Sequence, residues 1–191
     1  DTVVAEDTFY KAISFMNNNL DVAIMGPKLI DGSGTFLKES KRGVPTPKVA
    51  FYKATGLYKI SPKLFGKYYN LRLDKDSSGL TDILVGAFMF MRREHFIKLK
   101  GFDEDCFMYS DDIDFSYRSL LIGQKNYYNA GLTVIHFKGE SSANNFRYQL
   151  IFQNGMNYFF NKHFEISKAL KFIIKYSISL FSILKRFRGS Q

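Results

Sequence analysis

The segment Gly101-Phe-Asp-Glu-Asp-Cys-Phe-Met-Tyr-Ser-Asp-Asp-Ile-Asp-Phe-Ser-Tyr-Arg118 carries the strongest signal in this sequence. It holds six carboxylates within 18 residues of a 191-residue chain whose formal net charge is +9. Asp111, Asp112 and Asp114 open an apolar-periodic run that Gly123 ends. An acid at the start and a glycine just past the end predict a helix over about residues 111–122.

Two interpretations of this acidic cluster are open. Acids in a first turn are favoured by the helix dipole and by the free N–H groups there, so the cluster could act only as a helix cap. A cap needs one acid, however, and these acids follow an aromatic turn of Phe107, Met108 and Tyr109. Such a turn is typical of a carboxylate presented to a cleft. We therefore expect a functional site at Asp111 and Asp112.

The segment also resembles the signature of family 2 glycosyltransferases, and within them the bacterial rhamnosyltransferase-like enzymes that build surface polysaccharide. The resemblance rests on Gly-Phe-Asp-Glu at 101–104, Met-Tyr at 108–109, acid-Asp-Ile-Asp at 111–114 and Arg118 in the next turn. In that family the acid–Asp pair supplies the general base. The resemblance therefore implies that Asp112 is the base and that Asp111 orients it or binds the acceptor. The commoner family form is Glu-Asp, so the first acid here is one methylene shorter.

Two further segments fit the same resemblance and imply substrate contacts. Residues 81–91 resemble an element in which an aspartate precedes Gly-Ala beneath the transferred sugar. Residues 40–46 resemble a Ser-X-Arg, Pro-Thr element, in which the arginine faces the donor diphosphate; a solvated basic loop is the alternative. The substrate-binding residues implied in this way are Asp82, Gly86, Ala87 and Arg42, together with Tyr109 of the aromatic turn.

A metal site is implied at Asp1 and His136. By the resemblance, Asp1 is the last aspartate of a metal-binding motif, and His136 follows Asp112 at the family's spacing. A structural histidine at a strand end is the alternative. Oxygen-rich ligation of a diphosphate favours Mn²⁺ or Mg²⁺ over Zn²⁺. The same register implies that the nucleotide-binding strands lie upstream of this chain.

The apolar pattern predicts an α/β fold. The expected elements are a helix at 8–16, a strand at 22–30 interrupted by Gly26-Pro27, a central buried strand at 81–91, two strands at 125–128 and 132–137 joined by a turn, and a long helix at 144–164. The resemblance implies a GT-A-like mixed sheet flanked by helices. We expect residues 1–164 to form the C-terminal, acceptor-side part of such a domain.

Residues 165–191 predict a separate element. Lys168, Lys171, Lys175 and Arg186 fall along one stripe of an otherwise apolar helix. That pattern is typical of an amphipathic helix lying in a membrane interface, whereas docking on the domain or on a second copy is the alternative. Because we find no signal peptide and no spanning segment of ~20 apolar residues, we expect a cytoplasmic protein, peripheral at the cytoplasmic face of the inner membrane.

These features favour a glycosyltransferase that moves a sugar from a nucleotide diphosphate sugar to a hydroxyl of a glycan or lipid-linked glycan. Two alternatives stay open. The chain could be a non-catalytic portion that binds acceptor or membrane, or a basic module that binds nucleic acid through the interleaved aromatic and basic residues 47–70. The acidic centre argues against nucleic acid, and we expect none as a partner. The single cysteine, Cys106, excludes a disulfide framework.

Overall fold

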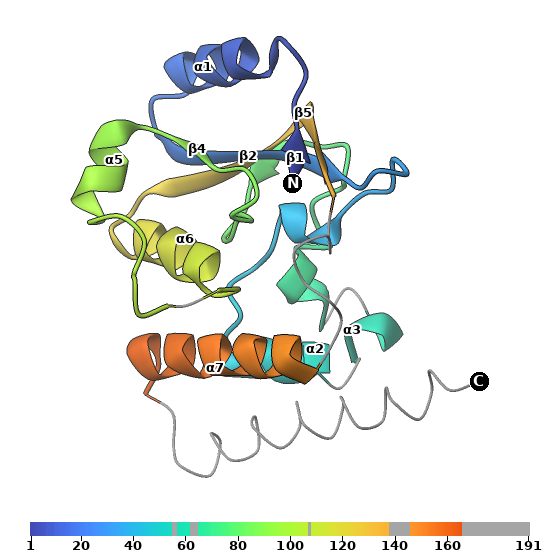
Figure 1. The fold of residues 1–191 in the computed structure, drawn as a ribbon, viewed down its shortest axis with the longest axis vertical. Coiled ribbons are helices and arrows are strands. Elements are labelled where there is room, and N and C mark those ends of the chain that lie inside the picture. Colours follow the sequence, from blue (N-terminus) through green and yellow to red (C-terminus); the bar gives the residue numbers. More distant parts are fainter. Residues whose placement is uncertain (55–56, 62–64, 107, 138–145, 166–191) are drawn as a thin grey trace.

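The computed structural model describes residues 1–54, 57–61, 65–106, 108–137 and 146–165 (Figure 1). Within them the chain forms a mixed α/β fold with a five-stranded sheet that has helices on both faces. The predicted α/β class is confirmed, and the GT-A type stays a prediction. The expected membrane-binding helix at 165–191 lies outside the described residues, apart from Glu165.

Two parallel strands form the centre of the sheet. They are β2 (Val22–Ile30) and β5 (Lys125–His136). The short strands β1 (Thr2–Val3) and β3 (Gly79–Leu80) pair antiparallel with opposite ends of β5, and β4 (Phe90–Met91) pairs antiparallel with β2. Strand β2 is buried along most of its length, as expected for a strand covered on both faces.

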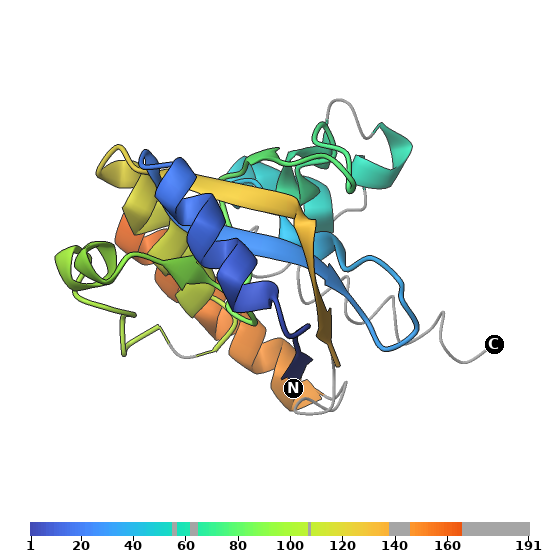
Figure 2. The same cartoon turned by 90° about the horizontal axis from the view of Figure 1, so that it is seen from above.

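The helices form layers on this sheet. Helix α1 (Thr8–Asn18) crosses the central strands on one face (Figure 2), where Ala12 and Met16 pack on Val22 and Met25. On the other face α6 (Asp111–Leu121) places Phe115 against Ile24 and Leu84. Helix α7 (Phe146–His163) forms an outer layer against α6 (Figure 1). The remaining short helices are α2 (Pro47–Ala54), α3 (Leu57–Ile60), α5 (Arg93–Lys98) and the 3₁₀ turns η1 (Lys38–Ser40) and η2 (Gly66–Tyr69).

The predicted central strand at 81–91 is wrong. Only Phe90–Met91 joins β2, while Gly79–Leu80 joins β5, and the residues between them cross from one pairing to the other. Ile83 packs with Phe159 of α7, whereas Leu84 packs with Ile24 of the sheet. The run is apolar because it supplies two core layers and not because it lies inside the sheet.

The two strands predicted at 125–128 and 132–137 form a single strand. Residues 125–129 and 133–135 pair with the same strand β2 in the same parallel sense, so the chain does not reverse between them. A bulge, opposite the step from Pro27 to Lys28, absorbs the extra residues. Strand β2 is continuous through Gly26-Pro27, which pair with Tyr128 and Asn129, so the interruption predicted there is wrong. The helices predicted at 8–16, 111–122 and 144–164 are confirmed in their described residues.

Candidate active site

Asp112, at the start of α6, forms a buried ion pair with Arg42. The guanidinium nitrogen Nη2 of Arg42 donates a hydrogen bond of 2.7 Å to Oδ2 of Asp112. The backbone amide of Gly86 donates a second hydrogen bond of 2.9 Å to the same oxygen. Three distant segments that the sequence assigned to one site, 40–46, 81–91 and 101–118, are therefore brought together at this carboxylate.

The other oxygen of Asp112 stands apart from these contacts. Oδ1 is buried and has no hydrogen-bond partner among the described residues. Gly86 fits against this side chain because a Cβ at that position would lie 3.3 Å from the Cβ of Asp112. The glycine thus permits the close backbone approach that its place in an apolar run indicated.

Asp111 lies beside this carboxylate and is half-buried. Burial raises the pKa of Asp111, and the neighbouring negative charge of Asp112 raises it further, while nearby backbone amides and Arg42 lower it in part. The net pKa shift is upward. Two adjacent carboxylates in different environments are a common arrangement in acid–base sites.

Arg42 is buried, with 7% of its surface exposed, so the solvated-loop interpretation of this residue is wrong. Burial lowers the pKa of Arg42, but Asp112 and Tyr68 raise it by more, and the guanidinium stays charged. The same nitrogen, Nη2, also donates a hydrogen bond of 2.7 Å to the carbonyl oxygen of Leu84. The arginine therefore supplies a fixed positive charge to Asp112, and its contact with a diphosphate stays a prediction.

The cap interpretation does not account for Asp112 and Asp114 of α6. The N-cap residue, Ser110, makes no side-chain capping hydrogen bond, and its Oγ lies 3.0 Å from the sulfur of Cys106. Asp112 bonds to groups outside the helix, and Asp114 is fully buried among cations. These carboxylates have partners beyond the helix start.

The aromatic turn before α6 has a strained backbone. Met108 and Tyr109 are consecutive non-glycine residues with φ of 44° and 69°. Each such residue costs about 1–3 kcal/mol and persists only where its surroundings enforce it. Here α7 packs closely against the turn at Gly155. A Cβ at that position would lie 3.0 Å from the Met108 carbonyl oxygen and 2.6 Å from Ser110 Oγ. Strain of this kind is often found at functional sites.

The remaining expected substrate residues belong to the segments that meet at this centre. Asp82 is half-buried, and its Oδ2 accepts a hydrogen bond of 3.1 Å from the Val44 amide. Ala87 and Tyr109 are half-buried. Their contacts with substrate stay predictions.

Asp1 and His136 are neighbours, as the resemblance implied. Strand β1 pairs with β5 in a register that sets Thr2 opposite His136, and Asp1 Oδ2 lies 3.4 Å from His136 Nε2. A carboxylate oxygen and an imidazole nitrogen could serve as two of the ligands that coordinate a Mn²⁺ or Mg²⁺ ion. No group of three or more metal-ligating side chains occurs in the described part of the chain, and the metal site stays a prediction.

A second charged cluster was not predicted from the sequence. Asp114 accepts a hydrogen bond from Arg118 Nε at 2.6 Å, lies 2.7 Å from His163 Nε2 and pairs with Lys162 at 2.8 Å. Lys162 also pairs with Asp103. The cluster joins α7 to α6 beneath the candidate site.

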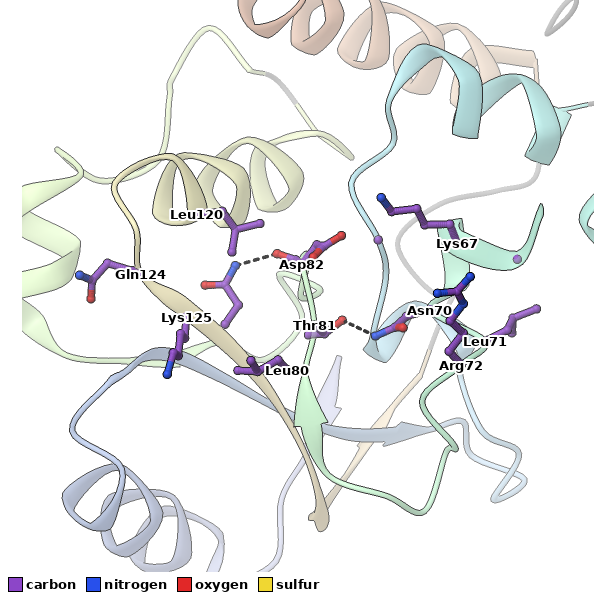
Figure 3. A pocket seen from close by; sticks show the side chains of 13 residues that line it. Lys67, Asn70, Leu71, Arg72, Leu80, Thr81, Asp82, Leu120, Gln124 and Lys125 are labelled. Carbon is purple, nitrogen blue, oxygen red and sulfur yellow. Dashed lines mark hydrogen bonds between the residues drawn. The ribbon is translucent and has the colours of Figure 1, made fainter. Parts of the chain in front are cut away.

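A pocket of about 510 Å³ lies between residues 66–72 on one side and residues 120–126 on the other, with Thr81 and Asp82 between them (Figure 3). Asp82 is one of its lining residues, but Asp112 is not. Its other polar walls come from residues 67–72 and 124–126, and the sequence analysis indicated only the part of them that belongs to the basic and aromatic run 47–70.

Comparison with known proteins gives a partial similarity. The chain is 36% identical over 61 residues to the rhamnosyltransferase WbbL of Escherichia coli (strain K12), a match that covers 32% of this chain and 23% of that protein. No family model matches the chain. Among the helices that the structure describes, none combines the length and the apolar character needed to span a bilayer. The comparison indicates a distant relation to a glycosyltransferase.

Proposed function

We propose that this chain is part of a glycosyltransferase that moves a sugar from a nucleotide diphosphate sugar to a hydroxyl of a glycan acceptor, with inversion at the anomeric carbon. The partial similarity to a rhamnosyltransferase supports this class. The observation that carries the proposal is the carboxylate pair at the start of α6. Asp112 is anchored by Arg42 and Gly86, and Asp111 beside it has a raised pKa.

The reaction requires a base at the attacking oxygen, because a sugar hydroxyl is a poor nucleophile. Asp112 would take the proton of the acceptor hydroxyl on Oδ1, the oxygen that has no hydrogen-bond partner among the described residues. Arg42 holds Oδ2 and so fixes the direction of the carboxylate. Asp111 would orient the acceptor or the base. Asp82, Gly86, Ala87 and Tyr109 would position the sugar.

The leaving diphosphate carries negative charge that must be neutralised. Mn²⁺ or Mg²⁺ held by Asp1 and His136 would supply a Lewis acid for this purpose. His136 and Asp1 occupy the edge of the sheet where β1 and β5 meet.

A transfer assay with Asp112→Asn tests the proposal. The substitution keeps the shape of the side chain but removes the proton acceptor, so we expect transfer to fall by at least ~100-fold while donor binding, measured by calorimetry with Mn²⁺, is kept. The control is Asp105→Asn, which removes an exposed acid from the same segment. Transfer by Asp112→Asn within twofold of the control would refute the base assignment.

The same measurements separate the enzyme from a non-catalytic portion of one. The matched relative extends well beyond the matched region, since the match covers 23% of it. Donor titrations should therefore be made on this chain and on a version extended upstream. Donor binding by the extended version alone would identify this chain as the acceptor-side portion. Absence of nucleotide-sugar binding from both versions would refute the glycosyltransferase proposal.

A further inference from the structure

We propose that the pocket lined by Lys67, Arg72, Asp82 and Asn126 binds a saccharide that carries a negative charge on a carboxylate or phosphate group. Its volume of about 510 Å³ lies within the range of small-molecule sites. Neither Asp111 nor Asp112 lines this pocket. Leu120, on its wall, follows Asp112 by eight residues, which is about 12 Å along the axis of α6.

The charge of the pocket favours an anion. Lys67 and Arg72 are exposed on one wall, and neither forms an ion pair within the described residues. Lys125, on the opposite side, is already paired with Asp21 at 2.6 Å. Two cations therefore remain for a ligand. Figure 3 shows the segment of Lys67 and Arg72 facing the segment of Leu120 to Lys125.

The polar groups of the pocket favour a ligand with hydroxyls over a simple anion. Asp82 extends from between the two walls toward the side of Lys67 (Figure 3), and its carboxylate would repel a bare phosphate but accept hydrogen bonds from hydroxyls. Asn126 is 1% exposed, and its Nδ2 donates to the carbonyls of Asp82 and Ser116. Its Oδ1 has no partner in the described residues, which is an unfavourable state for a buried acceptor.

Apolar side chains of the pocket also favour a saccharide as the ligand. Leu71, Leu80 and Leu120 line the pocket, and Leu71 and Leu80 are 39% and 57% exposed. Exposed leucines beside hydrogen-bonding groups can cover the C–H faces of a sugar ring, whereas inorganic phosphate has no apolar face to bury. A charged saccharide can interact with all three kinds of group: its anionic group with the cations, its hydroxyls with the hydrogen-bond acceptors, and its C–H faces with the leucines.

The pocket shares its wall with the Asp112 centre. Arg42 and Ile83 exchange backbone hydrogen bonds of 2.9 Å in both directions, and Thr81 Oγ1 donates to the Arg42 carbonyl at 3.1 Å. The segments that hold Asp112 therefore continue directly into Gly43, Thr81 and Asp82 of the pocket. Asp82 belongs both to this pocket and to the residues proposed to position the transferred sugar, but saccharide binding in the pocket does not depend on transfer by this chain.

Calorimetry on the 191-residue chain at low salt tests the site, with glucuronate, glucose 1-phosphate, glucose and inorganic phosphate as probes. We expect one or both charged sugars to bind at least ~10-fold more tightly than glucose and inorganic phosphate. The tighter of the two identifies carboxylate or phosphate as the anionic group. Inorganic phosphate binding as tightly as both charged sugars, or no binding by either sugar, would overturn the proposal.

Variants locate the binding. Lys67→Gln/Arg72→Gln should weaken the charged sugars at least ~10-fold, whereas Arg93→Gln/Lys98→Gln, which removes two exposed cations from α5, should change them less than twofold. Asp82→Asn should weaken the sugars but not inorganic phosphate. Amide chemical-shift changes should fall in residues 66–72, 80–82 and 124–126. Equal losses in both double variants, or shifts confined to residues 108–112, would refute this location whether or not the chain transfers sugar.

Discussion

Arg42 and Asp112 lie 70 positions apart in the chain and form an ion pair of 2.7 Å in which both side chains are about nine-tenths buried. The pair joins the loop after η1 to the start of α6. Burying two charges is costly, so a pair of this kind contributes little net stability while intact. It fixes the position of a carboxylate, which is what a catalytic base requires.

Arg42→Met should destabilise the protein by about 3–5 kcal/mol, because it leaves the Asp112 carboxylate buried without a countercharge. Arg42→Met/Asp112→Leu should cost less than the sum of the two single changes, since no charge then remains buried. Urea unfolding measures both. Lys125→Met is the control: it breaks an exposed pair with Asp21 and should cost under about 1 kcal/mol. A similar small loss in Arg42→Met would show that the pair is not buried in solution.

Asp111 should make stability fall as pH rises. Its folded pKa is raised above the ordinary value of 3.8 by burial and by Asp112. Between these two values the native state holds more protons than the unfolded state, so the free energy of unfolding decreases through that window and then levels off. In Asp111→Asn this decrease should be absent, whatever constant offset the lost charge produces. Urea unfolding at a series of pH values compares the two slopes; parallel curves would contradict the raised pKa.

Local patterns in the sequence predicted the helices but not all strands. Helix α1 and helix α6 have apolar stripes and clear ends at Asn17–Asn19 and Gly123, and these signals are local. The run 81–91 is as apolar as a central strand, but its side chains are divided between two core layers. Which layer an apolar residue joins is decided by tertiary packing, and periodicity does not report it.

The candidate site was predictable in part. The acids of 101–118 and the glycine at 86 are marked in the sequence, and the structure places Gly86 against Asp112. The partner of Asp112 was not predictable, because nothing near Arg42 indicates a contact 70 residues away. The pocket residues come from four segments that share no spacing or motif. Sites of this kind become visible only when the fold brings the segments together.

Asp114 should be essential for stability through its contacts with α7. Burial raises the pKa of this carboxyl, but Lys162, His163 and Arg118 lower it by more, so the net shift is downward. Asp114→Ala should therefore cost about 3–5 kcal/mol, because three cationic or hydrogen-bonding groups lose a common acceptor. Asp105→Ala, which removes an exposed acid of the same segment, is the matched control. Equal unfolding free energies for the two variants would contradict the role of this cluster.

The same carboxyl predicts a loss of stability in acid. Because the folded pKa of Asp114 is below its unfolded value of 3.8, its contribution is present above pH 3.8 and disappears as pH falls through the folded pKa. Asp114→Asn should show a flatter dependence of the unfolding free energy on pH in that window. The comparison needs circular dichroism during urea unfolding at closely spaced acidic pH values. A wild-type curve as flat as that of the variant would rule out the lowered pKa.

Cys106 should be inert in the folded protein. Its side chain is buried, with 2% of its surface exposed, and burial raises the pKa of the thiol to about 11. Thiolate is the reactive form, so a disulfide reagent at pH 8 should modify native protein at least ~100-fold more slowly than protein unfolded in urea. Ser110→Ala removes the hydroxyl 3.0 Å from the sulfur without opening the turn, and should keep the thiol protected. Rapid modification of the native wild type would show that the turn before α6 opens in solution, and the positions of Met108 and Tyr109 would then no longer be fixed.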